Sequence, residues 1–112
     1  MRAPQRGEVW LVDLGLAAKV RPCLVLSRPP DDSDRALVSL VPHTTSLRGS
    51  HYEVVLRVPF LRPGGFDVQS IVTVPFAKLL RILGKLTTAQ LAEVESRVSL
   101  WLGLSPSEKP ET

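Results

Sequence analysis

The chain has 112 residues, a length that predicts one domain large enough to bury a core of its own. Its 44% hydrophobic and 22% charged residues are ordinary for a globular protein, and they exclude a disordered or fibrous chain. Fourteen Lys and Arg against 11 Asp and Glu give a net charge of +3, which permits an anionic partner without requiring one.

The sequence has no segment typical of membrane insertion, secretion or metal binding. No apolar run approaches the roughly 20 residues that span a bilayer, and no charged start followed by an apolar stretch resembles a secretion signal. We therefore expect a cytoplasmic protein with no membrane partner. The single cysteine, Cys23, lies in an apolar run and predicts a buried structural thiol. No H-E-x-x-H, G-x-x-x-x-G-K or C-x-x-C motif is present, and we expect no cofactor.

Two strands are predicted near the amino end. The first runs from about Glu8 to Leu14, where apolar residues on both faces indicate a strand that is largely covered. Gly15 breaks it. The second spans residues 23–27 and is opened by Arg21-Pro22, since a proline is tolerated where a strand's first residue can spare its N–H.

Three more strands follow at intervals marked by turn residues. The third covers residues 36–41, is expected to be central, and runs into Pro42 and a polar cluster at residues 43–46. The fourth, residues 51–58, alternates apolar and polar positions. A Pro-Gly-Gly turn at residues 63–65 separates it from a fifth strand, residues 66–74.

The carboxyl-terminal part is expected to be helical. After Pro75 the pattern is ambiguous, with a short helical turn and then an extended piece near residues 81–86. Thr87 and Gln90 form a capping box before a helix that Gly103 ends. An apolar stripe on that helix should pack on the sheet; it consists of Leu91, Val94, Val98, Trp101 and Leu102.

These elements predict a mainly β fold with one helix (β plus α). Five or more short strands before a single terminal helix favour a small, strongly curved β-barrel. We assign residues 1–104 to this single domain. The Pro-, Ser- and Glu-rich segment 105–112 should be a disordered tail.

Polar side chains at strand ends are the candidates for chemistry. If the second and third strands pair in antiparallel, Arg21 lies opposite Thr44. A guanidinium holds a phosphate through two parallel N–H bonds, and a threonine hydroxyl adds a further donor. His43 is a candidate proton shuttle, because its ordinary pKa suits work near neutrality.

Structural alternatives to these roles stay open at this stage. Arg21 could form a salt bridge with Asp13 or Glu8 on a neighbouring strand. The hydroxyls of Thr44, Thr45 and Ser46 are typical of turns. Gln69 could occupy an outer face, and Lys19 could belong to the solvated surface.

Five stretches taken in order resemble the PemK/MazF family of toxin endoribonucleases. They are RGEVWLVDL (6–14), RPCLVLS (21–27), LVPHTTS (40–46), FDVQSIVTVP (66–75) and LGKLTTAQLAEVESRVSLWLGL (83–104). The resemblance implies an SH3-like β-barrel of five to seven strands with a C-terminal α-helix, CcdB/PemK-like, and a two-fold homodimer. It also implies a cognate antitoxin and metal-independent cutting of single-stranded RNA. The RNA's own 2'-hydroxyl attacks, leaving a 2',3'-cyclic phosphate and a 5'-hydroxyl.

The resemblance also assigns roles to residues. Arg21 matches the arginine of the family's R-P motif, implied to act in proton transfer and to stabilise the phosphorane, and Thr44 matches the threonine that assists at the same phosphate. Polar side chains around this pair are the candidate RNA-binding residues: Lys19, His43, Thr45, Ser46, Gln69 and Thr73.

Two departures from the family pattern favour a second reading. The loop between Asp13 and Arg21 is shorter than in many relatives, and Val72 stands where relatives often have an arginine. The alternative is therefore a non-catalytic binder of nucleic acid or protein on the same barrel, such as a gyrase poison of the CcdB type.

Overall fold

The computed structural model describes residues 2–15 and 19–104, and in them a curved sheet carries one α-helix. The seven strands are β1 (Glu8–Asp13), β2 (Val20–Val25), β3 (Leu37–Thr44), β4 (Glu53–Val55), β5 (Gly65–Asp67), β6 (Val72–Pro75) and β7 (Leu79–Lys85). Two 3₁₀ turns, η1 (Val68–Ser70) and η2 (Phe76–Lys78), flank β6, and the helix is α1 (Thr88–Leu102).

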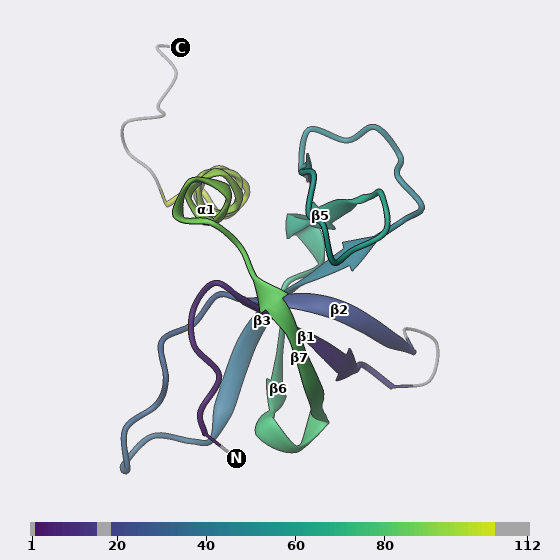
Figure 1. Ribbon diagram of the computed structural model, residues 1–112. Helices are drawn as coiled ribbons and strands as arrows, with labels where there is room; N and C mark the ends of the chain where they lie inside the picture. Colours follow the sequence, from purple (N-terminus) through teal and green to yellow (C-terminus); the bar gives the residue numbers. More distant parts are fainter. Residues whose placement is uncertain (1, 16–18, 105–112) are drawn as a thin grey trace.

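All strand pairs are antiparallel, and the order across the sheet is β4-β5-β3-β2-β1-β7, with β6 paired to β3. Figure 1 shows α1 beside the β4–β5 pair at one end of the molecule, with the other five strands gathered at the other end. The ladder is not closed into a ring. The predicted mainly β, barrel-like fold with a C-terminal helix is confirmed.

Two apolar clusters occupy the two faces of the curved sheet. Along β1, Val9 points into one cluster while Trp10 and Val12 point into the other, as the alternation of a strand requires. On β2, Leu24 joins the first cluster and Cys23 the second. The first cluster is covered by α1 through Val94 and Val98, which are buried. Apolar residues on both faces of the central strands follow from this arrangement.

The strand bounds differ from the predicted ones at several places. Arg21 and Pro22 lie inside β2, which begins at Val20, and β3 extends past Pro42 to Thr44. The predicted strand 51–58 shortens to β4, because the chain turns at Val58–Leu61, where the Leu61 N–H donates to the Val58 carbonyl at 3.0 Å.

The predicted strand 66–74 is split into β5 and β6 by η1. The carboxylate of Asp67 caps this turn by accepting from the Gln69 N–H at 3.1 Å and from the Ser70 hydroxyl at 2.7 Å. The break has a clear consequence. β5 pairs with the last two residues of β3 and β6 with residues 37–40, so the chain steps past the middle of that strand.

The capping box at Thr87 and Gln90 is confirmed, and α1 ends at Gly103 in the left-handed conformation (φ 70°). The apolar stripe of α1 packs on the sheet as predicted at Val94 and Val98. It does not do so at its end, where Trp101 and Leu102 are 41% and 50% exposed. Two elements pack against α1, namely β4 and η1, and each is only three residues long; Trp101 contacts the ring of Tyr52.

The predicted tail, 105–112, lies outside the described residues, and the assignment of 1–104 to one domain stays a prediction. No helix in the described ranges is long and apolar enough to cross a bilayer.

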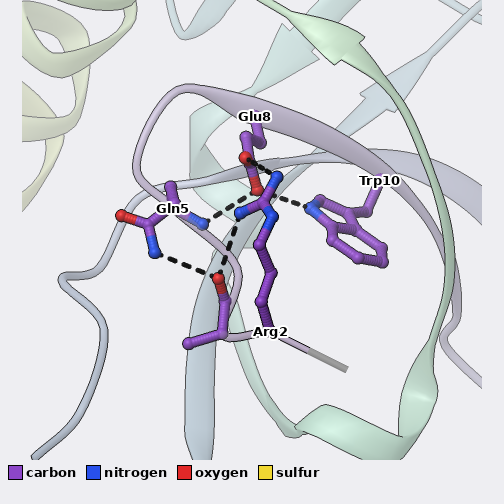
Figure 2. Close-up of polar contacts among 5 residues, drawn as sticks. Arg2, Gln5, Glu8 and Trp10 are labelled. Carbon is purple, nitrogen blue, oxygen red and sulfur yellow. Dashed lines mark hydrogen bonds and ion pairs between the residues drawn. The ribbon is translucent and has the colours of Figure 1, made fainter.

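A buried carboxylate fixes the amino-terminal segment to β1. Figure 2 shows the Arg2 and Trp10 side chains and the Gln5 backbone N–H directed at Glu8, which is only 5% exposed. Arg2 Nη2 donates to Oε2 at 2.7 Å, while the Gln5 N–H and Trp10 Nε1–H donate to Oε1 at 2.9 and 3.0 Å. Burial by itself raises the pKa of Glu8, but these hydrogen bonds outweigh it and the pKa is lowered from 4.5.

We expect Glu8→Gln to destabilise the fold by about 2 kcal/mol at pH 7, because the buried bonds to a charged acceptor are lost. Since the folded pKa is lowered, the carboxylate's contribution is complete above its unfolded pKa near 4.5 and disappears as the pH falls through the folded value. Urea unfolding at pH 7 and pH 3 measures both effects. The gap between variant and parent should narrow at pH 3, and an equal gap at both pH values would contradict this account. Glu53→Gln, which removes a half-buried carboxylate at the start of β4 that accepts from backbone N–H groups of the preceding loop, is the control.

Candidate functional site

A cleft of about 470 Å³ brings Arg21 and Thr44 together, as the antiparallel pairing predicted. The β2–β3 ladder ends at the pair Cys23–Pro42, and extending its register by two residues along each strand sets Arg21 across from Thr44. The cleft is lined by Leu14, Arg21, Pro42, His43, Thr44, Asp67, Ser70, Ile71 and Val72.

Arg21 is held by a paired strand. Its backbone lies opposite Val12 of β1, and Pro22, next in sequence, restricts the backbone further. The side chain is partly buried and its charge acts on Cys23 two residues away. Burial nevertheless raises the pKa of the Cys23 thiol to about 12, so this thiol stays protonated at neutral pH and is a poor nucleophile.

Of the two acids considered as partners of Arg21, Glu8 is occupied by the amino-terminal segment. Its oxygens accept from Arg2, Gln5 and Trp10, as described above. Asp13 accepts from the Gly15 N–H through Oδ1 at 3.0 Å. The Glu8 alternative is therefore wrong for this fold.

Thr44 takes part in a local turn, which was one of the alternatives for its hydroxyl. Its Oγ1 accepts from the Ser46 N–H at 3.0 Å. A threonine hydroxyl has one proton to donate and two acceptor lone pairs, so this bond leaves the proton available for a ligand in the cleft. The turn orients the hydroxyl rather than occupying it fully.

His43 is 5% exposed and packs edge-on against Phe66, with ring centroids 5.1 Å apart. Burial lowers the pKa of its imidazole from 6.5. His43 is therefore neutral at physiological pH, where it can accept a proton but adds no positive charge to the cleft.

Six cleft residues were not among the sequence candidates: Leu14, Pro42, Asp67, Ser70, Ile71 and Val72. Asp67 and Ser70 reach the cleft because η1 breaks the predicted strand, and the local signal for this break was an Asp followed three residues later by a Ser. Both Asp67 oxygens already accept hydrogen bonds within the turn. Leu14 supplies apolar surface just beyond the end of β1. Val72 also lines the cleft, so the wall has no cation at the position where the family resemblance led us to expect one.

The remaining sequence candidates do not all meet at this cleft. Thr45 lines a second cleft, which it shares with Arg21 and His43. Ser46 is exposed in the turn after β3, and Lys19 is exposed beside β2 with a positive φ of 55°. Gln69 is exposed on η1. Thr73 lies on β6, where its hydroxyl is 2.7 Å from that of Ser39.

No group of three or more His, Cys, Asp or Glu side chains in residues 2–15 and 19–104 is placed to hold a metal ion. The cleft that contains Arg21 and Thr44 offers a guanidinium, two hydroxyls, a neutral imidazole and the Asp67 carboxylate, whose two oxygens already accept hydrogen bonds within its turn. The donors among these groups suit a tetrahedral oxyanion that gains charge during a reaction, because N–H and O–H donors stabilise such charge.

Comparison with known proteins gives one consistent family. A family model described as PemK-like, MazF-like toxin of type II toxin-antitoxin system matches residues 5–102. The probable endoribonuclease MazF5 of Mycobacterium tuberculosis is 32% identical over 94 residues, which cover 81% of this chain and 85% of that protein.

Solved structures agree with this result. An endoribonuclease from a mycobacterial species, in complex with its cognate antitoxin, superposes with a TM-score of 0.79 at 28% identity, covering 92% of this chain and 98% of that one. MazF of Deinococcus radiodurans superposes with a TM-score of 0.77 at 25% identity, covering 92% and 99%.

Proposed function

Since this chain belongs to the PemK-like, MazF-like toxin family of type II toxin-antitoxin systems, we propose that it is an endoribonuclease that cuts single-stranded messenger RNA in the cytoplasm. The observation that carries the proposal is the cleft lined by both Arg21 and Thr44, which lie on the neighbouring strands β2 and β3. A fixed guanidinium beside a hydroxyl donor is suited to a phosphodiester.

In the proposed reaction the RNA supplies its own nucleophile. The 2'-oxygen forms a bond to phosphorus as its proton is removed, and the bond from phosphorus to the 5'-oxygen breaks as that oxygen gains a proton. The products are a 2',3'-cyclic phosphate and a 5'-hydroxyl. Arg21 stabilises the extra negative charge of the five-coordinate phosphorus, and Thr44 donates to a non-bridging oxygen. No step requires a metal ion.

The test is incubation of the purified protein with single-stranded RNA in EDTA, followed by analysis of the ends. We expect cut RNA with 2',3'-cyclic phosphate and 5'-hydroxyl ends. Cutting that requires added Mg²⁺, or 5'-phosphate products, would overturn the proposed chemistry.

A non-cutting binder is the second candidate, and the apolar Val72 in the cleft wall favours it. In that case the protein would retain single-stranded RNA, or a protein target, without producing new ends. The same incubation separates the two functions, because it reports binding by retention and cutting by the appearance of ends.

We assign His43 to proton transfer, on its place in the cleft beside Thr44 and its lowered pKa. A neutral imidazole accepts the proton of the 2'-hydroxyl, so the rate should fall only when the pH drops below about 6.5 and through the lowered pKa. We expect His43→Gln to slow cutting on the order of 10²-fold and to remove this acidic limb. A full pH–rate profile, with folding checked by circular dichroism, measures it. An unchanged rate and profile would exclude His43 from the reaction.

The proposal includes two protein partners, a second copy of this chain in a two-fold homodimer and a cognate antitoxin. The support for the antitoxin is the similar mycobacterial endoribonuclease, whose structure contains its antitoxin. Light scattering of the purified chain tests the dimer, and a single-chain mass would contradict it. Suppression of RNA cutting by an acidic protein encoded beside the toxin tests the antitoxin.

A further inference from the structure

We propose that the second cleft is a binding subsite for the nucleotides next to the cut phosphate, with Arg62 and Arg81 as phosphate ligands and Phe60 as a stacking surface. This inference rests on the proposed function. The cleft has a volume of about 530 Å³ and includes Arg21, His43 and Thr45 among its walls.

The floor of the second cleft is the uncovered half of one sheet face. Leu11 of β1 lies opposite Pro22 of β2 on one side and opposite Arg81 of β7 on the other. Two residues away on the first two strands, Val9 and Leu24 are buried in the cluster beneath α1. The helix and the β4–β5 segment thus cover one end of this face and leave the other end open as an apolar floor.

Positive charge surrounds this floor from three separate elements. Arg21 comes from β2, Arg81 from β7, and Arg62 from the loop between β4 and β5. Within the described part of the chain, no Asp or Glu lines the cleft. Guanidinium groups from three elements form a site for a polyanion, because each can make two N–H bonds to a phosphate.

Phe60 is placed by a fixed turn rather than by a loose loop. It follows Pro59 in the turn closed by the Leu61 N–H and the Val58 carbonyl at 3.0 Å. Val58 is buried, and Gln90 of α1 donates through Nε2 to the neighbouring Arg57 carbonyl at 3.1 Å. A Cβ at Gly84 would lie 2.5 Å from Phe60 Cε2, so one part of the ring rests on the β7 backbone. Phe60 as a whole is still 36% exposed, which leaves surface for a base.

The two clefts adjoin at the candidate catalytic residue, because Arg21 and His43 line both of them. By strand alternation, Arg21 and Thr44 belong to the face of the second apolar cluster, while the floor of the second cleft lies on the other face. An RNA strand with its scissile phosphate at Arg21 would therefore reach the second cleft around the end of β2. Proteins that bind single strands without sequence preference typically hold the phosphates with basic side chains and stack the bases on aromatic rings. Arg62, Arg81 and Phe60 therefore extend the site from one phosphate to several nucleotides.

The experiment measures binding separately from cutting. The probe is a fluorescent, mixed-sequence 2'-O-methyl oligonucleotide of about 12 nucleotides, which cannot supply a 2'-hydroxyl nucleophile. Its length lies within the range of nucleotides that one small barrel domain binds. Its affinity is measured by anisotropy over a salt series. Each phosphate contact on a single strand contributes about 0.7 to the slope of log Kd against log salt, so Arg62→Ala/Arg81→Ala should lower the slope by about 1.4. Phe60→Leu should weaken binding about tenfold with an unchanged slope, because it removes stacking and no charge.

The matched control is Arg28→Ala/Arg35→Ala, which removes the same charge from the exposed β2–β3 loop, a segment distant from the β4–β5 loop in Figure 1. If both double variants lower the slope equally, or neither does, the subsite is wrong. RNA cutting by the parent distinguishes this failure from failure of the proposed function. If the parent protein does not cut RNA but Arg62→Ala/Arg81→Ala still lowers the salt slope of binding, the subsite is supported as the groove of a non-cutting binder. Normal cutting with an unchanged KM in Arg62→Ala/Arg81→Ala overturns the subsite alone.

Discussion

Replacing Arg21 with alanine is expected to slow RNA cutting by about 10³-fold, the loss typical when one preorganised donor to a developing oxyanion is removed. The guanidinium lies on a paired strand in the cleft that holds Thr44, so its place does not depend on loop closure. Because the donor acts on charge that develops during the reaction, the loss should appear in kcat more than in KM. Single-turnover cutting of a defined transcript measures it.

Arg21→Lys is the informative companion variant. Lysine keeps the positive charge but cannot offer two parallel N–H bonds from a rigid plane. We expect it to recover only a small part of the lost rate. Recovery to the parent rate would show that Arg21 acts as a point charge, and an active Arg21→Ala protein would remove it from the reaction. Urea unfolding of both variants checks that the fold is intact.

The sequence predicted well those features that depend on short-range patterns. The capping box at Thr87 and the termination of α1 at Gly103 follow from residue type, and the presence of Arg21 and Thr44 in one cleft agrees with antiparallel pairing of β2 and β3. The strand bounds were less accurate, because a proline such as Pro42 reads as a strand end although β3 continues past it.

The parts of the site that were missed depend on long-range geometry. Asp67 enters the first cleft only because η1 interrupts a run that reads as one strand. Arg62 and Arg81 are 19 residues apart in sequence, on a loop and an edge strand. Only the curvature of the sheet brings them to one cleft, and no local pattern in a single sequence marks such a pair.

The contact between β3 and the segment before β5 yields the largest expected effect on stability. A Cβ at Gly64 would lie 2.2 Å from the Thr44 carbonyl oxygen and 2.9 Å from His43 Cε1. The first of these atoms belongs to the backbone of a paired strand, which cannot move aside cheaply. We expect Gly64→Ala to destabilise the fold by about 3 kcal/mol, at the upper end of the usual cost of overpacking. Thermal unfolding should show Tm lower by more than about 10 °C.

Gly65→Ala is the control that shows whether any alanine at the start of β5 is destabilising, or only one that meets the Thr44 backbone. Its Cβ would lie 3.1 Å from Leu47 Cδ2, the far end of a side chain, and 3.2 Å from the Val54 carbonyl oxygen, so smaller shifts relieve it. It should therefore lose less stability than Gly64→Ala. At a temperature where both variants are folded, Gly64→Ala should also cut RNA more slowly, because the added methyl group displaces the backbone that carries Thr44 and His43. Equal stability and equal cutting in the two variants would mean that the approach of Gly64 to Thr44 does not hold the site in place.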